Sequence, residues 1–358
     1  MTPTTSTTQP LVLGVDTHQR RHHAALVTAE GRLLADHEFP ATSTGYHQLW
    51  QWATSFGPIT QAGVEASASY GAGLTRLLTA HDVTVIDVNT PDLPRRYAHG
   101  KTDQLDAHAA AMAVFTGRAE AIAKDTTGIV ESVRMLYVAR ASAVDEATRI
   151  GNQLRDLVTT APAEWADRCR AATTTAQRIT LIEALPAPAP KAKLSAPAAA
   201  FVRAGRSLLT RYRLAQREVT DLTRELTALL TTMVPTLLAR PHIGPVTAAR
   251  LVITVGENID RMRSEATFAK LVGVAPLPAS SGKTHRHRLN RGGDRQANSA
   301  LHMIVVGRMK NHPPTRAYVE RRSAEHKTKK DIIRCLKRYV AREVFKDLTT
   351  DLGALDKL

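Results

Sequence analysis

The sequence has little of three features that define large classes of protein. It contains two cysteines, Cys169 and Cys335, which excludes a disulfide framework and a cysteine-rich zinc site and fits a reducing compartment. Aromatic residues make up 4% of the chain, so we do not expect base-stacking platforms to dominate any binding of nucleic acid. Apolar runs are shorter than the roughly 18 residues that a membrane-spanning helix needs, so we expect no membrane partner. Residues 1–10 lack the basic start and apolar centre of a signal peptide.

Positive charge is abundant and unevenly placed. Lys and Arg number 48 against 33 Asp and Glu, which gives a formal net charge of +15. Residues 283–346 hold 18 basic and 5 acidic side chains, whereas residues 1–120 hold 8 and 11. The concentration in one segment favours a phosphate-binding surface, because each Lys or Arg that neutralises a phosphate releases counterions. The alternative is a solvated, charge-rich helical surface.

The first 125 residues have the pattern of a mixed α/β domain. Three short strands come first, and strands and helices then alternate. A helix over 43–56 has Ser43 or Thr44 as its expected N-cap. The expected strands are 11–15, 24–28, 33–39, 60–65 and 83–88, and the other expected helices are 70–80 and 104–115.

The rest of the chain is expected to be mainly helical. Residues 126–236 carry a heptad seam from Tyr212 to Met233 and a weaker one from Val130 to Val158, which predicts a coiled-coil segment whose helices pair within one chain or between chains. The Pro- and Ala-rich stretch 185–200 between them is expected to be a loop. Residues 237–346 form the predicted third unit, with helices expected over 242–255, 293–309 and 329–346. Pro313-Pro314 separates the last two of these helices. Residues 347–358 are expected to be a tail.

Four acidic residues in the first domain form a candidate metal site. Asp16 closes one apolar strand and Glu65 closes another, at the edge where α/β sheets place ligands. Asp103 and Asp106 are three residues apart, which puts both on one face at the start of a helix, although Asp103 can instead be its N-cap. Carboxylates from separate segments suit hard cations such as Mg²⁺, which can clamp a phosphodiester under attack.

A second candidate lies at the start of the basic segment. Ser281 precedes Gly282 on a Pro-rich turn, where a serine can approach a backbone phosphate closely. Serine is a weak nucleophile at its ordinary pKa and needs a base or a metal to activate it. The neighbouring cations would neutralise charge on the phosphate. They are Lys283, Arg286, Arg288, Arg291 and Arg295.

These motifs together resemble one family. GVDTH, GVEASASYG and KTDQLDAHAA in the first domain, followed by HIGPVTAARLV and VGVAPLPASSGKTHRHRLNRGGDRQANSALH, are similar to the DEDD insertion-sequence transposases, the bridge-RNA-guided serine recombinases of bacterial mobile elements. The resemblance runs from Val12 to about Lys346. It implies a ribonuclease H-like (RuvC-like) N-terminal domain, a helical coiled-coil segment and a mainly helical C-terminal transposase domain.

The resemblance also implies roles and partners. Asp16, Glu65, Asp103 and Asp106 would bind Mg²⁺ or another hard divalent cation, and Ser281 would form a phosphoserine link to DNA. Ser280, directly before it, leaves the nucleophile open by one position. The implied partners are donor and target DNA, a structured non-coding guide RNA, and further copies of the chain in a dimer or tetramer. The implied location is the bacterial cytoplasm, at the nucleoid.

Two alternatives stay open on the residues alone. A hydrolytic nuclease of the Holliday-junction-resolvase type would use the four acids and leave Ser281 structural. A non-catalytic nucleic-acid-binding protein would keep the basic segment and a degenerate nuclease domain. A protein–DNA adduct distinguishes the recombinase from both.

Overall fold

The structure is a computed structural model and describes residues 9–88, 102–185, 195–280, 282, 287–288, 290 and 292–355. The described chain folds as two compact units. The first comprises residues up to Glu131 together with Val255–Phe268, and the second comprises Ser132–Thr254 and the residues from Ala269 onward. Among the described residues, no helix has both the length and the hydropathy needed to cross a membrane.

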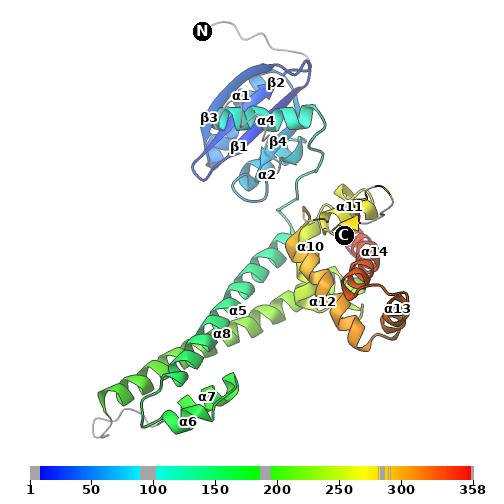
Figure 1. Cartoon of the computed structure of the whole chain (residues 1–358). Helices are drawn as coiled ribbons and strands as arrows, with labels where there is room; N and C mark the ends of the chain where they lie inside the picture. The colour runs from blue at the N-terminus through cyan, green and yellow to red at the C-terminus, as the bar shows by residue number, and fades with distance from the viewer. Residues whose placement is uncertain are drawn as a thin grey trace. The chain divides into compact units, whose positions relative to one another are not determined.

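A five-stranded mixed sheet forms the centre of the first unit (Figure 1). The strand order is β3-β2-β1-β4-β5, in which β1, β2 and β3 run antiparallel and β4 and β5 run parallel to β1. This arrangement confirms the expected α/β class and is compatible with a ribonuclease H-like domain. The strands are β1 (Leu11–Thr17), β2 (Arg21–Val27), β3 (Leu33–Pro40), β4 (Ile59–Glu65) and β5 (Thr84–Val88).

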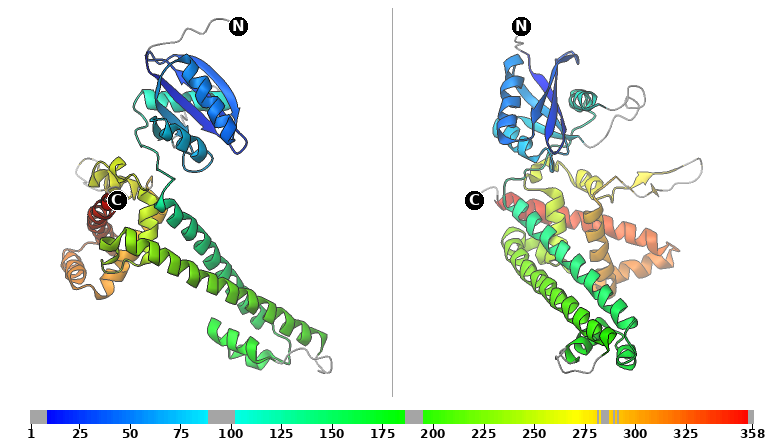
Figure 2. Two further views of the ribbon diagram at one scale, coloured as in Figure 1. Left: turned by 180° about the vertical axis from the view of Figure 1, so that it is seen from behind. Right: turned by 90° about the vertical axis from the view of Figure 1, so that its left-hand side faces the viewer.

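Helices cover both faces of this sheet (Figure 2). The helices α1 (Ser43–Phe56) and α2 (Ala72–Ala80) lie on one face, where Leu49 and Leu74 join the same core as Leu13 of β1. The helix α4 (Asp103–Phe115) lies on the opposite face against β1, β2 and β4. The helix α1 has the predicted range, but Thr42 is its N-cap rather than Ser43 or Thr44, and its side chain accepts a hydrogen bond from the Gly45 N–H at 3.1 Å.

Two glycines let α4 approach the sheet at backbone distance. A Cβ atom on Gly14 of β1 would lie 2.2 Å from the Ala107 carbonyl oxygen, and a Cβ atom on Gly63 of β4 would lie 2.5 Å from the Ala110 carbonyl oxygen. Such contacts are far shorter than van der Waals distance, so only glycine fits at either position. The alanine-rich sequence of α4 therefore packs directly over β1, and its first turn comes to the strand end that carries Asp16.

The residues Val255–Phe268 belong to the first unit, although the sequence places them in the third segment of the chain. Asn258 fixes them, because its side-chain N–H donates to the Ala123 carbonyl at 2.9 Å and its side-chain oxygen accepts from the Asp125 N–H at 3.2 Å. This stretch contains a short 3₁₀ helix, Ile259–Arg261, and the start of α11 (Glu265–Leu271). The domain boundaries at 125 and 236 stay predictions.

Two long helices dominate the second unit and lie side by side (Figures 1 and 2). They are α5 (Ile129–Thr159) and α8 (Ala196–Met233), and the Arg140 Nε–H of α5 donates to Thr223 Oγ1 of α8 at 2.7 Å. The two helices thus contact each other within one chain, while a coiled coil and pairing between chains stay predictions. The loop predicted over 185–200 is wrong at its end, because Ser195 caps a helix that already includes residues 196–200. Residues 186–194 lie outside the described part.

A smaller group of helices completes the far end of this pair. The helices α6 (Ala166–Arg170) and α7 (Thr175–Ala184) bury Cys169 and Ile182 against Leu154 of α5 and Phe201 of α8. The remaining elements of the second unit are α9 (Pro235–Leu238), α10 (Pro245–Val255), β6 (Leu277–Pro278), β7 (His287–Arg288), α12 (Arg295–Asn311), α13 (Pro313–Ala324) and α14 (Lys329–Leu355).

The helix α14 continues nine residues beyond the predicted end of the third unit. Residues 347–355 were expected to be a tail, and that expectation is wrong. They are helical, and their acidic side chains are buried against Arg240 and the first turn of α9. Asp347 accepts two hydrogen bonds of 2.8 Å from the Arg240 guanidinium. Asp351 accepts from the backbone N–H groups of Thr236 and Leu237 at 3.3 and 3.0 Å, which caps the first turn of α9.

Candidate functional site

Asp16 and Glu65 lie at the same end of two neighbouring parallel strands. The strands β1 and β4 are parallel with Val15 opposite Val64, so the next residue on each strand reaches the same end of the sheet. The Thr17 hydroxyl donates to the Glu65 carbonyl oxygen at 2.8 Å and joins the two strand ends. The Asp16 residue is 3% exposed, and Glu65 is half-buried.

Asp103 and Asp106 occupy the first turn of α4. Thr102 is the N-cap, since its hydroxyl accepts a hydrogen bond from the Leu105 N–H at 3.3 Å. Asp103 is therefore the first helical residue and not the cap, so its carboxylate is available for other contacts. Asp103 is exposed and Asp106 is buried, and a negative charge at this end of a helix is favoured by the helix dipole.

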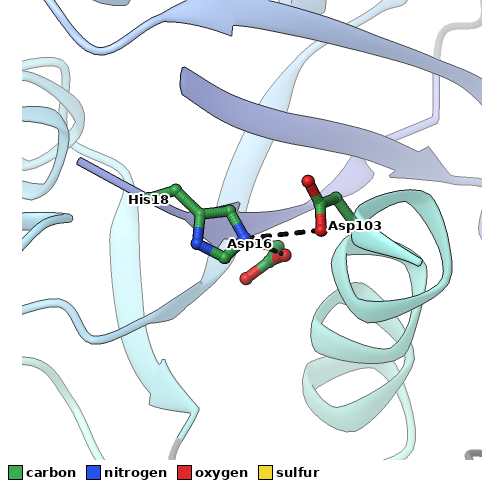
Figure 3. A group of neighbouring side chains, drawn as sticks. All are labelled: Asp16, His18 and Asp103. Carbon is green, nitrogen blue, oxygen red and sulfur yellow. Dashed lines mark hydrogen bonds and ion pairs between the residues drawn. The ribbon is translucent and has the colours of Figure 1, made fainter. Parts of the chain in front are cut away.

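His18 joins these acids and was not among the residues singled out from the sequence. Its Nε2 atom lies 3.1 Å from Oδ2 of Asp16 and 3.4 Å from Oδ1 of Asp103 (Figure 3). One ligand atom from each of the three residues lies within 4.8 Å of the others. The signal that could have found His18 is its spacing of two from Asp16, which in an extended chain directs both side chains to the same side.

Asp16, His18, Asp103 and Asp106 form what we call the acidic centre, and its electrostatics favour the binding of a cation. Burial raises the pKa of Asp16 above its ordinary value, His18 lowers it, and the Asp106 and Asp103 carboxylates raise it again. A buried carboxylate near two others carries an energetic cost that a divalent cation would relieve. Carboxylate oxygens are the donors that Mg²⁺ and Mn²⁺ prefer, whereas an imidazole nitrogen is a better ligand for a transition metal. The residues present therefore fit a divalent metal, with Asp16, His18 and Asp103 as the nearest ligands.

The structure gathers part of the predicted acidic set. It brings Asp16 and Asp103 together and places Asp106 close enough to influence Asp16, while Glu65 stands at the neighbouring strand end.

The basic segment is described in part. Ser281, Lys283, Arg286 and Arg291 lie outside the described residues. Ser280 is exposed, and Gly282 has a φ of +53°, a left-handed conformation that favours glycine. Arg295 is the exposed first residue of α12, behind the N-cap Asp294. Arg288 in β7 lines a cleft of about 1400 Å³ in the second unit.

Two stretches of the chain match known families. Residues 13–161 match the DEDD transposase model of the IS110 type, described as a transposase. Residues 235–320 match a model described as the transposase IS116/IS110/IS902 family. The first match contains Asp16, Glu65 and the Asp pair, and the second contains Ser281 and the cations from Lys283 to Arg295.

A curated relative is similar over a shorter stretch. The chain is 36% identical over 95 residues to the insertion element IS110 uncharacterized 43.6 kDa protein of Streptomyces coelicolor. The alignment covers 26% of this chain and 23% of the relative. It spans about a quarter of each protein, so the relative is similar to a part of this chain.

Proposed function

The chain belongs to the DEDD transposases of the IS116/IS110/IS902 family, and on that premise we propose that it cuts and rejoins DNA strands through a covalent serine intermediate. Ser281 supplies the nucleophile, and the acidic centre of the first unit holds a divalent cation, Mg²⁺ in the first instance. The observation that carries the proposal is the cluster of Asp16, His18 and Asp103 inside the stretch that matches the family.

The acids would serve the reacting phosphate group indirectly, by holding a cation. Asp16, Glu65, Asp103 and Asp106 would hold the cation, and His18 adds a nitrogen donor between Asp16 and Asp103. A divalent cation bound there supplies Lewis acidity at a phosphate oxygen. The burial of Asp16 keeps bulk water from its carboxylate, and this strengthens its attraction for positive charge.

The serine step conserves the energy of the phosphodiester bond. The Ser281 oxygen attacks the phosphorus atom, a phosphoserine ester forms, and the bond from phosphorus to one sugar oxygen breaks. The serine proton is lost and the departing sugar oxygen gains a proton. A sugar hydroxyl of another strand reverses the step, which reseals DNA without ATP. Lys283, Arg286, Arg288, Arg291 and Arg295 offset the charge on the phosphate.

The partners follow from the same proposal. The substrates are donor and target DNA, and a structured guide RNA would select both by base pairing, so that the protein reads mainly the backbone. The acids of one copy and the serine of another would act together in a dimer or tetramer. The site of action is the bacterial cytoplasm, at the nucleoid. The high net charge of +15 supports a polyanionic partner.

A recombination assay with purified components tests the proposal. The protein is expressed with its native flanking DNA, purified in high salt, and the bound RNA is sequenced to define the donor and target. We expect one discrete RNA from the flanks, and recombination that Asp16→Ala and Ser281→Ala each abolish. Free cleaved ends with an active Ser281→Ala variant would replace the recombinase by a hydrolytic nuclease. Tight binding without cleavage in any divalent metal would favour a non-catalytic protein.

A further inference from the structure

A basic cleft lies in the second unit between the β6–β7 hairpin, the loop after it, and the N-terminal half of α14. Its volume of about 1400 Å³ exceeds the range of roughly 300–1,000 Å³ that suits small molecules. Among the described residues that line it, Asp331 is the acidic one, and seven are basic. The basic residues are Arg288, Arg322, Lys327, Arg334, Lys337, Arg338 and Arg342.

Three of these cations form a row along α14. Arg334, Arg338 and Arg342 are spaced by four residues, which places them on one face of the helix in a row about 12 Å long. Arg334 also contacts Asp331 at 3.0 Å, one turn earlier. A row of guanidinium groups matches a linear anion with regularly spaced charges, because each fork can bind one phosphate in a bidentate manner.

The arginines of this row repel one another, and a bound anion would offset that repulsion. Burial lowers the pKa of Arg338, and the charge of Arg342 lowers it further. Like charges four residues apart on a helix destabilise it. Phosphate groups placed along the row would offset this repulsion.

Lys337 gives the cleft a fixed ammonium group. The residue is 7% exposed, and its Nζ donates to the Asn298 side-chain oxygen. Asn298 is itself fixed, since its amide donates to the carbonyl oxygens of Val272 and Gly273 at 2.9 and 3.1 Å. Burial lowers the pKa of Lys337 to about 8. The cleft thus has a buried, oriented donor in addition to its exposed arginines.

An exposed aromatic ring stands beside the row. Tyr339 lines the cleft and is 47% exposed. The Tyr318 ring contacts it edge to face at 5.6 Å, and the Arg342 guanidinium lies 5.8 Å from its centroid. These contacts hold the ring in place, so a base can stack on it at a low cost in side-chain entropy. Base stacking requires an unpaired strand.

We propose that this cleft binds a single strand of nucleic acid, with Arg338 and Arg342 on successive phosphates, Lys337 beneath them and one base stacked on Tyr339. The inference rests on the proposed function and deepens it, because it gives a strand-binding role to the arginine row of α14, which the proposed function leaves without one. The strand can be an unpaired part of the guide RNA or a displaced strand of DNA, since both present the same phosphodiester chemistry.

Binding of labelled oligouridine, oligothymidine and a short DNA duplex to the full-length protein tests the inference. We expect the double variant Arg338→Gln/Arg342→Gln to bind both single-stranded oligomers at least about tenfold more weakly than the wild type. The slope of log K against log salt should fall by about 1.4, which is two contacts at roughly 0.7 each. Tyr339→Ala should weaken single strands about fivefold or more and leave the duplex unchanged. Tighter binding of one oligomer identifies the strand as RNA or DNA.

A matched control separates the cleft from bulk charge. Arg211→Gln with Arg217→Gln removes the same charge from exposed positions on α8 and should change binding by less than threefold, as for a ~0.6 kcal/mol effect. Equal losses in the two double variants, or a Tyr339→Ala variant that loses duplex and single-strand binding equally, would overturn the inference. Arg342→Gln alone, at an exposed position, replaces the double variant if thermal melting shows that the latter is unfolded.

The result is independent of catalysis. Ser281→Ala should bind both single strands as the wild type does. Cleft-dependent binding by a protein that forms no DNA adduct would support the cleft and refute the serine mechanism. An adduct formed at the normal rate by the Arg338/Arg342 variant, with unchanged binding, would refute the cleft and leave the mechanism intact.

Discussion

The Nε2 atom of His18 lies 3.1 Å from Oδ2 of Asp16. The same nitrogen lies 3.4 Å from Oδ1 of Asp103, so the imidazole stands between two carboxylates that come from a strand and a helix. Carboxylates so close repel each other unless a positive or hydrogen-bonding group separates them. A divalent cation relieves the same repulsion, and the stability of the first unit should therefore respond to metal.

Metal should stabilise the wild type and not the Asp16→Asn variant. At a Mg²⁺ concentration ten times the Kd, we expect about 1.4 kcal/mol of stabilisation and a melting temperature raised by about 3 to 6 °C.

Because burial raises the folded-state pKa of Asp16, the stability that its protonated form contributes below pH 3.8 is lost as pH rises through the folded pKa. At pH 7 without metal, Asp16→Asn should therefore unfold at a higher temperature. Calorimetry with Glu120→Gln, an exposed acid, as the control measures both effects.

Gly14→Ala should destabilise the first unit and disturb the acidic centre together. The new methyl group would lie 2.2 Å from the Ala107 carbonyl oxygen, so α4 must move away from β1. We expect a loss of about 3 kcal/mol in the free energy of unfolding and a weaker Mg²⁺ effect, since Asp103 moves with the helix. Gly353→Ala is the control, because nothing lies within 4 Å of its Cβ position and alanine favours the helix by about 1 kcal/mol. Urea denaturation with and without Mg²⁺ distinguishes the two variants.

Asp347→Ala should destabilise the second unit although Asp347 lies in the last twelve residues. The side chain is 2% exposed and accepts both hydrogen bonds from Arg240, whose guanidinium is partly solvated. We expect a loss of about 2 kcal/mol, as for hydrogen bonds to a charged group. Asp221→Ala breaks an exposed pair with Arg224 on α8 and should cost less than about 0.5 kcal/mol. Equal midpoints in denaturant for the two variants would contradict a structural role for the end of α14.

Nucleic-acid binding should weaken as the pH rises through the pKa of Lys337. Burial lowers that pKa to about 8 from 10.5, so the ammonium loses its proton earlier than an exposed lysine would. We expect the affinity for oligouridine to fall about fivefold between pH 7 and 9, the effect of one phosphate contact at about 0.1 M salt. Over the same range, and up to 10.5, the contribution of Lys337 to the free energy of unfolding rises, because the unfolded chain binds more protons.

Lys337→Arg isolates this effect from the other groups of the cleft. A guanidinium stays charged across the range, so the variant should lose most of the pH dependence. Asp331, His287, Cys335 and Tyr339 also face the cleft, beside its arginines, and remain in both proteins. An identical pH profile for wild type and Lys337→Arg in anisotropy titrations would assign the dependence to one of them.

The sequence predicted the first unit better than the second, for physical reasons. Strands such as β1 are short apolar runs bounded by polar turns, and α1 was predicted at Ser43–Phe56 because its amphipathic period is clear. The helix α13 was missed, since Thr315 alone is buried among its residues and no apolar stripe marks it. The end of α14 has the composition of a solvated tail, and only the fold shows that Asp347 and Asp351 are buried partners.

The acidic centre was predictable in part. The strand-end positions of Asp16 and Glu65 follow from local pattern, and the spacing of Asp103 and Asp106 follows from the helix period. The contact of His18 with Asp103 depends on the approach of α4 to β1, which Gly14 and the alanines of α4 permit. The charge pattern predicted a phosphate-binding surface over residues 283–346, but not the cleft, because its lining comes from segments whose proximity is set by tertiary packing.

The most direct test of the serine mechanism is the search for a covalent protein–DNA adduct. The full-length protein, its flank-encoded RNA, and donor and target DNA are incubated with Mg²⁺, denatured, digested and analysed by mass spectrometry. We expect a nucleotide linked through phosphate to the peptide that contains Ser281, absent in Ser281→Ala and in Asp16→Ala. Cleaved DNA without any adduct, or an adduct that persists in Ser281→Ala, would contradict the serine mechanism.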